Sequence, residues 1–116
     1  LDVGHCAYFK EISKIDDIEQ KIETLNECIC SLIGKLGKKL FCMHVHNVRK
    51  RDWRDHRSVD TGVIDFPRIF HKLKTVGYSG TLDIELEEDD KERACLNTGR
   101  YLSQLCANIL DPPTPS

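Results

Sequence analysis

The sequence predicts an α/β protein built around a parallel sheet, and three observations carry this prediction. Apolar residues recur at alternating three- and four-residue steps across 15–36, which is typical of an amphipathic helix. The segments 40–46 and 81–87 are short and rich in apolar residues, as strands are. Helical and strand segments alternate along the chain, and this order indicates βαβ units whose strands run parallel.

The first long helix is expected over 15–36. Its apolar residues form one stripe, with Ser13 or Asp16 near the start as a cap and Gly37 near the end. A stripe this strict also occurs in coiled coils. Because the stripe is short and an apolar strand follows it, we favour packing against a sheet.

The first strand is expected at 40–46, where the run LFCMHVH lacks polar alternation. A nearly continuous apolar run suits a strand that is buried on both faces, as in a parallel sheet covered by helices. The polar and basic stretch 47–63 that follows is expected to form a long loop.

A second helix is expected to begin at Asp65 and to end at Gly77. Aspartate is a good N-cap, Pro67 fits the first turn because its missing N–H has no helical partner there, and glycine is favoured just beyond a helix. The chain is completed by a strand at 81–87 (TLDIELE), a helix at about 88–110 and a disordered tail at 111–116.

Composition restricts the class of protein. With 31% charged and 40% hydrophobic residues and a net charge of −2, the 116-residue chain is expected to be one soluble domain without general attraction to nucleic acid or membranes. No run reaches the about 18 apolar residues of a transmembrane helix, and the start is not typical of a signal peptide. Because the chain opens on LDVGH without Met, we expect it to be a piece of a longer protein.

The six cysteines show no paired C-x-x-C spacing. We therefore expect reduced thiols that pack as small hydrophobic residues. Reduced cysteines are typical of a cytoplasmic protein.

The strands carry the residues that point to a metal site. Because side chains alternate between the faces of a strand, Asp83, Glu85 and Glu87 share one face of the second strand. The same alternation puts His44 and His46 together at the carboxyl end of the first strand, where parallel sheets and barrels have their sites. Carboxylates on a covered face need partners or a cation. The alternatives are structural histidines, and glutamates that simply leave the core.

The stretch 49–57 (RKRDWRDHR) is the one basic cluster of the sequence. Guanidinium groups bind phosphate or carboxylate in bidentate fashion, so this cluster is either an anion clamp beside the site or a solvated loop. One short basic patch on a slightly acidic chain gives little support to nucleic-acid binding.

Four segments resemble a known family, in the same order: LDVGH at 1–5, MHVH at 43–46, TGVIDFPRIFHKLKTVGYSG at 61–80 and TLDIELE at 81–87. Together they are similar to the second half of the xylose-isomerase-like TIM barrels. That superfamily includes sugar-phosphate isomerases, ketose 3-epimerases and inosose dehydratases, and the endonuclease IV repair enzymes are relatives. The resemblance implies a parallel-strand (β/α) half barrel over 1–110, the C-terminal part of a TIM barrel.

The resemblance also implies a metal centre. Asp2, His46 and Glu85 correspond to metal ligands of the family, and Glu85 corresponds to an acid/base catalyst as well. Oxygen and imidazole donors suit Mn, Mg, Co or Zn, so a divalent ion of this group is the expected cofactor.

Further residues are expected around the metal. His5 corresponds to a histidine that contacts substrate, and Arg51 lies near the place of a substrate-binding arginine. His44 is expected as a neighbour of the metal or an extra ligand. Asp55 and His56 stand near a D-x-H element of the family, without its spacer, and are further candidates.

The function implied by the resemblance is that of a metal-dependent sugar or sugar-phosphate isomerase or epimerase of carbohydrate metabolism. In such enzymes the metal stabilises an enediolate while carboxylates move the proton. The family's second catalytic glutamate would lie upstream of Leu1, so this piece alone is expected to be inactive. Its open sheet edges are expected to associate with a second copy or with the missing N-terminal half.

Two alternatives stay open at this point. One is an endonuclease IV-like metal-dependent hydrolase, and the other is a non-catalytic interaction module that retains part of the fold. The sequence leaves the substrate, the identity of the metal and the oligomeric state open.

Overall fold

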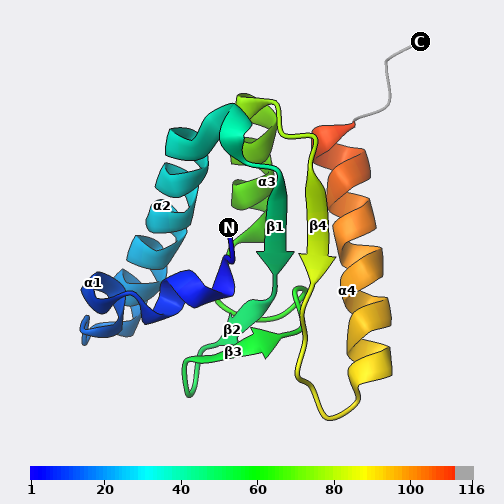
Figure 1. The fold of residues 1–116 in the computed structure, drawn as a ribbon. Coiled ribbons are helices and arrows are strands. Elements are labelled where there is room, and N and C mark those ends of the chain that lie inside the picture. Colours follow the sequence, from blue (N-terminus) through cyan, green and yellow to red (C-terminus); the bar gives the residue numbers. More distant parts are fainter. Residues whose placement is uncertain (112–116) are drawn as a thin grey trace.

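The computed structural model describes residues 1–111 and shows an α/β fold with a parallel strand pair at its centre (Figure 1). Strands β1 (Cys42–Val45) and β4 (Thr81–Ile84) run parallel, with Cys42 opposite Thr81 and His44 opposite Asp83. The parallel α/β prediction is confirmed. Both strands are shorter than the predicted segments, because only these residues have regular ladder partners.

The N-terminal segment adds a third parallel position beside β1. Asp2 forms an isolated parallel bridge with His44. The N–H of Val3 donates to the carbonyl of His44 at 3.1 Å, and the N–H of His44 donates to the carbonyl of Leu1 at 2.9 Å. Asp2 therefore lies directly next to His44 on the sheet.

Helix α2 (Ile18–Leu36) begins later than predicted. Its N-cap is Asp17, whose carboxylate accepts from the N–H of Gln20 at 3.0 Å, and neither Ser13 nor Asp16 has this role. A separate short helix, α1 (Lys10–Ser13), precedes α2 and follows the 3-10 turn η1 (Gly4–Tyr8). The apolar stripe therefore begins before the backbone break between α1 and α2. The 3-10 turn η2 (Gly37–Lys39) leads from α2 to β1.

Helix α3 (Phe66–Val76) has the predicted ends. The carboxylate of Asp65 accepts from the N–H of Arg68, Pro67 lies in the first turn, and Gly77 ends the helix in the left-handed conformation at φ 72°. The last helix, α4 (Lys91–Leu105), continues into a π-helical turn, η3 (Cys106–Leu110). The predicted tail at 111–116 lies outside the described residues except for Asp111.

The predicted loop 47–63 is wrong in part, since it contains an antiparallel hairpin of β2 (Asn47–Arg49) and β3 (Arg54–Arg57). The sequence of the hairpin has no hydrophobic alternation. Hydrogen bonds of polar side chains hold it instead. The buried Asn47 side chain bonds to the backbone of Val48, Val59 and Ile64.

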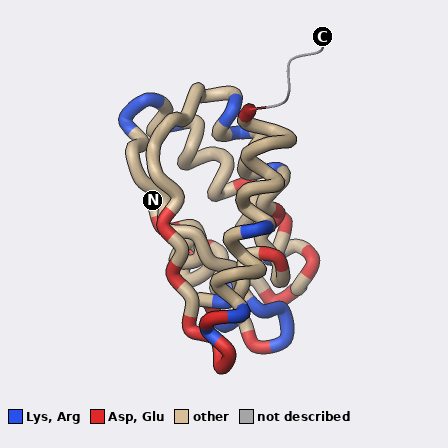
Figure 2. Tube along the Cα trace, turned by 90° about the vertical axis from the view of Figure 1, so that its right-hand side faces the viewer, with Lys and Arg blue, Asp and Glu red and all other residues tan. Residues whose placement is uncertain are grey.

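The two faces of the β1–β4 pair differ. Met43 and Val45 are fully buried in the core that α2 and α3 help to form, with α3 behind β1 in Figure 1. Cys42 and His44 point to the opposite face and are only partly buried. In Figure 2 acidic residues recur down the edge of the molecule that carries the N-terminus. Among the described residues, no helix is long and apolar enough to cross a membrane.

Candidate metal centre

Three side chains from three neighbouring sheet positions gather on the partly exposed face of the β1–β4 pair. This face carries Cys42 and His44 and is called the open face below. The three side chains are those of Asp2 of the N-terminal segment, His44 of β1 and Glu85 directly after β4, and one donor atom of each lies within 4.8 Å of the others. His44 Nδ1 is 3.0 Å from Glu85 Oε1 and 4.0 Å from Asp2 Oδ2. The parallel register causes this meeting, because it aligns the carboxyl ends of the strands.

His46 contacts Asp2 Oδ1, whereas His44 faces Asp2 Oδ2. The His46 ring is fully buried, with Nε2 2.5 Å from Asp2 Oδ1. Nδ1 accepts from the backbone N–H of His56 at 2.9 Å. Because Nδ1 is an acceptor, the proton of the neutral ring is on Nε2, which donates to Asp2. The structure thus brings two of the predicted ligands, Asp2 and Glu85, together with His44, while His46 contacts the far oxygen of Asp2.

The environment of Asp2 keeps its carboxyl ionised. Partial burial alone would raise the pKa of Asp2, but the backbone N–H of His5 and the ring of His46 together hold that pKa below its ordinary value. The N–H of His5 donates to Asp2 Oδ1 at 3.0 Å. An ionised carboxylate with one oxygen already fixed is a suitable metal ligand through the other.

Gly4 makes room for the His46 ring. A Cβ atom at this position would lie 2.0 Å from His46 Cε1 and 2.2 Å from His46 Nδ1. No side chain larger than hydrogen fits there unless the ring moves. The sequence motif LDVGH contains this glycine, but only the structure shows what approaches it.

Asp55 and His56 support His46 from the hairpin. The rings of His46 and His56 stack with centroids 4.2 Å apart and planes 10° from parallel. His56 Nδ1 lies 3.0 Å from Asp55 Oδ1, and His46, Asp55 and His56 form a second group of potential donors. His56 has a φ of 56°, a left-handed conformation that is unusual for a residue other than glycine.

The two predicted substrate-binding residues differ in position. His5 is beside the site, with Nδ1 3.7 Å from Asp2 Oδ2 and a side chain 68% exposed. Arg51 lies in the turn between β2 and β3 and forms no ion pair with Asp2 or Glu85.

Three cations of the basic cluster at 49–57 are paired with carboxylates, whereas Arg51 and Arg54 form no ion pair within residues 1–111. Arg49 pairs with Asp52, Lys50 with Glu19 and Arg57 with Glu88, at 2.6, 3.0 and 2.7 Å respectively. Because its carboxyl is bound by Arg49, the pKa of Asp52 falls to about 2. These ion pairs weaken the anion-clamp interpretation for Arg49, Lys50 and Arg57 only.

The donor chemistry of the open face fits a divalent cation. Among residues 1–111, no lysine or arginine forms an ion pair with Asp2, Asp83 or Glu85. Two carboxylates and an imidazole without a balancing positive side chain suit a hard or borderline ion such as Mn, Mg, Co or Zn.

Comparison with known protein families gives a match over most of the chain. The model of a protein family described as the xylose isomerase-like TIM barrel matches residues 1–105. No curated protein and no solved structure matches the chain.

Proposed function

Because the chain belongs to the xylose isomerase-like TIM barrel family, we propose that it carries the metal site of a divalent-metal-dependent sugar or sugar-phosphate isomerase or epimerase. The observation that carries this proposal is the meeting of Asp2, His44 and Glu85 on the open face of the sheet. In parallel (β/α) barrels, catalytic groups lie at the carboxyl ends of strands, where these three residues are. The unpaired cysteines support a cytoplasmic location.

We assign the metal ligands to Asp2, His44 and Glu85. The sequence predicted His46 in place of His44. In this assignment His46 orients the Asp2 carboxylate, because its Nδ1 accepts from the N–H of His56 and its Nε2 faces Asp2. A divalent ion bound here would polarise a substrate carbonyl and hydroxyl and stabilise the negative charge that develops when the neighbouring C–H is deprotonated.

Glu85 is the residue that would move the proton. Its side chain is 39% exposed on the open face, so a substrate can reach it, while Oε1 is held 3.0 Å from His44 Nδ1. His5 is largely exposed beside Asp2, where it can donate to a substrate hydroxyl. Isomerisation and epimerisation both need a carboxylate that accepts a proton from carbon and returns one.

Binding of Mn²⁺ alone, measured by calorimetry, tests the site. Glu85→Gln, Asp2→Asn and His44→Ala should each weaken binding by about tenfold or more, since even partners of ligands contribute this much. Glu87→Gln is the matched control, because Glu87 is exposed nearby and forms no ion pair among the described residues. Unchanged Mn²⁺ affinity in His44→Ala would favour His46 as the ligand.

Turnover tests the activity. A panel of ketoses and sugar phosphates, with exchange of the C–H proton for solvent deuterium as the readout, should show activity that Glu85→Gln abolishes. Measuring both this chain and the longest product of its gene separates a site that binds metal from one that is complete. No turnover and no exchange by either would contradict the proposal.

A second candidate is a hydrolase of the endonuclease IV kind. The observation that favours it is the second donor group of His46, Asp55 and His56 behind Asp2, because such hydrolases use several metal ions and more histidine ligands. Incision of an oligonucleotide with an abasic site, without turnover of any sugar, would favour this function. Metal binding with neither activity would favour an interaction module.

An exposed apolar side chain supports association, with a second copy or with an N-terminal half barrel. Phe41, directly before β1, is 75% exposed, and a large exposed apolar side chain of this kind is typical of a surface that another chain covers. Light scattering after gel filtration measures the oligomeric state.

A further inference from the structure

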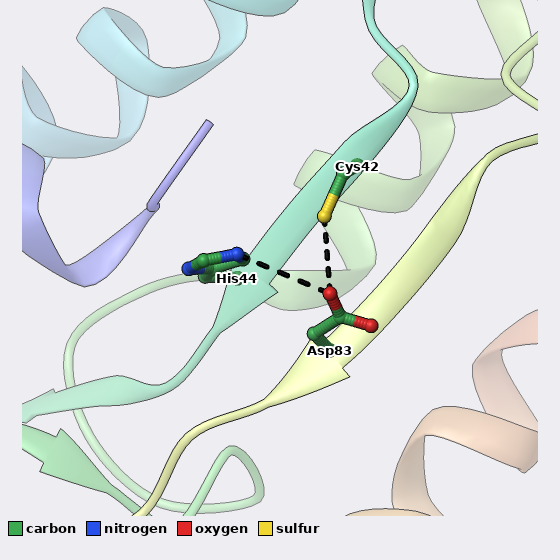
Figure 3. Close-up of side chains that lie close together, drawn as sticks. All are labelled: Cys42, His44 and Asp83. Atoms are coloured by element: carbon green, nitrogen blue, oxygen red, sulfur yellow. Dashed lines mark hydrogen bonds and ion pairs between the residues drawn. The ribbon is translucent and has the colours of Figure 1, made fainter.

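A second group of donors lies on the open face, next to the first and closer to the amino ends of the strands (Figure 3). Cys42 and His44 are two residues apart on β1 and so share a face, and Asp83 is the direct partner of His44 on β4. The register of two strands therefore sets the relative positions of all three side chains, without a contribution from a loop.

The distances suit joint binding of one ion. Cys42 Sγ is 3.1 Å from Asp83 Oδ2, and His44 Nε2 is 3.9 Å from the same oxygen. One donor atom of each residue lies within 4.8 Å of the other two. The side chains of His44 and Asp83 are 41% and 53% exposed, so an ion can enter from solvent.

His44 serves both groups through different nitrogens. Nδ1 faces Glu85 and Asp2, whereas Nε2 faces Asp83 and the thiol. Because a neutral imidazole has one free lone pair, an ion bound at Nε2 leaves the ring proton on Nδ1, which donates it to Glu85 Oε1. A sulfur, an imidazole nitrogen and a carboxylate oxygen are the donors that Zn²⁺ takes in proteins, and three protein ligands leave a fourth position open.

We propose that Cys42, His44 and Asp83 form a second divalent-cation site, selective for a thiophilic ion of the Zn²⁺ type. Binding replaces the thiol–carboxylate hydrogen bond, and the Cys42 proton is released to solvent so that the thiolate can coordinate. This site goes beyond the proposed function, which needs no thiolate and no ion at Asp83. It also needs no ion at Asp2 and Glu85.

Titration with Co²⁺ tests the proposal, because a thiolate bound to Co²⁺ gives a charge-transfer absorption in the near ultraviolet that oxygen and nitrogen ligands do not give. The protein should show this absorption, and Zn²⁺ should displace it. Cys42→Ser should abolish it, and Asp83→Asn should weaken Co²⁺ binding at this site by about tenfold or more. Cys95→Ser is the matched control, since Cys95 is a half-buried thiol on α4 that belongs to none of the donor groups, and it should leave the absorption unchanged.

The two proposed sites can be tested independently. Glu85→Gln should reduce Mn²⁺ binding and leave the thiolate absorption in place, while Cys42→Ser should do the reverse. Circular dichroism of each variant shows whether the fold is kept. The proposal is overturned if the folded protein gives no thiolate absorption with Co²⁺, or if the absorption persists in Cys42→Ser. In that case the Cys42–Asp83 contact is a hydrogen bond only.

Discussion

Replacing Gly4 by alanine should destabilise the chain, although glycine-to-alanine changes in helices usually stabilise. The new Cβ would lie 2.0 Å from His46 Cε1, whereas non-bonded carbons prefer about 3.5–4.0 Å. The ring has no free space to enter, because it is fully buried and stacked on His56 at 4.2 Å. Either the ring or the η1 backbone must therefore move by about 1 Å or more.

The expected cost follows from what the movement disrupts. Overpacking a well-packed site costs about 1–3 kcal/mol. Displacing His46 also breaks its hydrogen bonds to Asp2 and to the His56 N–H, at about 1 kcal/mol each. The helix preference of alanine over glycine returns at most about 1 kcal/mol. The net destabilisation should therefore be about 2–4 kcal/mol.

Urea unfolding with a chelator present measures this change. The matched control is Gly99→Ala on α4, where the new Cβ has no neighbour within 4 Å. Gly99→Ala should stabilise by about 0.5–1 kcal/mol. The reasoning is refuted if Gly4→Ala shifts the unfolding midpoint upward like Gly99→Ala, since the His46 ring could not then occupy its position against Gly4.

Three further predictions concern single residues. Asn47→Ala should cost about 2–4 kcal/mol in urea unfolding, because four backbone groups lose a buried partner, whereas the exposed Asn97→Ala should change stability by less than about 0.5 kcal/mol. Burial raises the pKa of the Cys6 thiol to about 12, so mass spectrometry after brief alkylation at pH 8 should find Cys6 modified last. Because the folded-state pKa of Asp2 is below its ordinary value, Asp2 stabilises the fold above that ordinary pKa, and this stabilisation is lost as the pH falls through the lowered value. Asp2→Asn should therefore flatten the acid side of the stability profile measured without metal.

Local chemistry decided which helix ends could be predicted. Helix α3 has its cap, its first-turn proline and its terminal glycine within the same short segment, so Asp65 and Gly77 marked both ends correctly. Two adjacent aspartates, Asp16 and Asp17, stand before α2, and either could cap it. The apolar stripe also continues through α1, since Ile12 of α1 is buried. Periodicity reports which residues face the core, and it does not report a break in the backbone between them.

The hairpin of β2 and β3 escaped prediction for a related reason. Hairpins are recognised by alternating apolar residues and by glycine or asparagine in the turn. Here the left-handed positions are occupied by Trp53 and His56, and the buried anchor is Asn47, a polar residue. The Trp53 ring fixes the turn by donating from Nε1 to the carbonyl of Ala7 at 2.9 Å, a contact across 46 residues that no local pattern shows.

Strand alternation placed His44 and His46 together, as an extended strand would. The family resemblance, rather than the alternation, predicted His46 as the ligand, and that role stays a prediction. The ladder with β4 ends at Val45, and the chain then turns into β2, so His46 points into the space beside Gly4. One histidine keeps both ring nitrogens toward the open face, and the other uses both of its nitrogens on the protein. A ligand needs a free nitrogen lone pair, and this division of hydrogen bonds between the two rings is why we propose His44 as the ligand and His46 as the residue that orients Asp2, while the predicted ligand role of His46 stays a prediction.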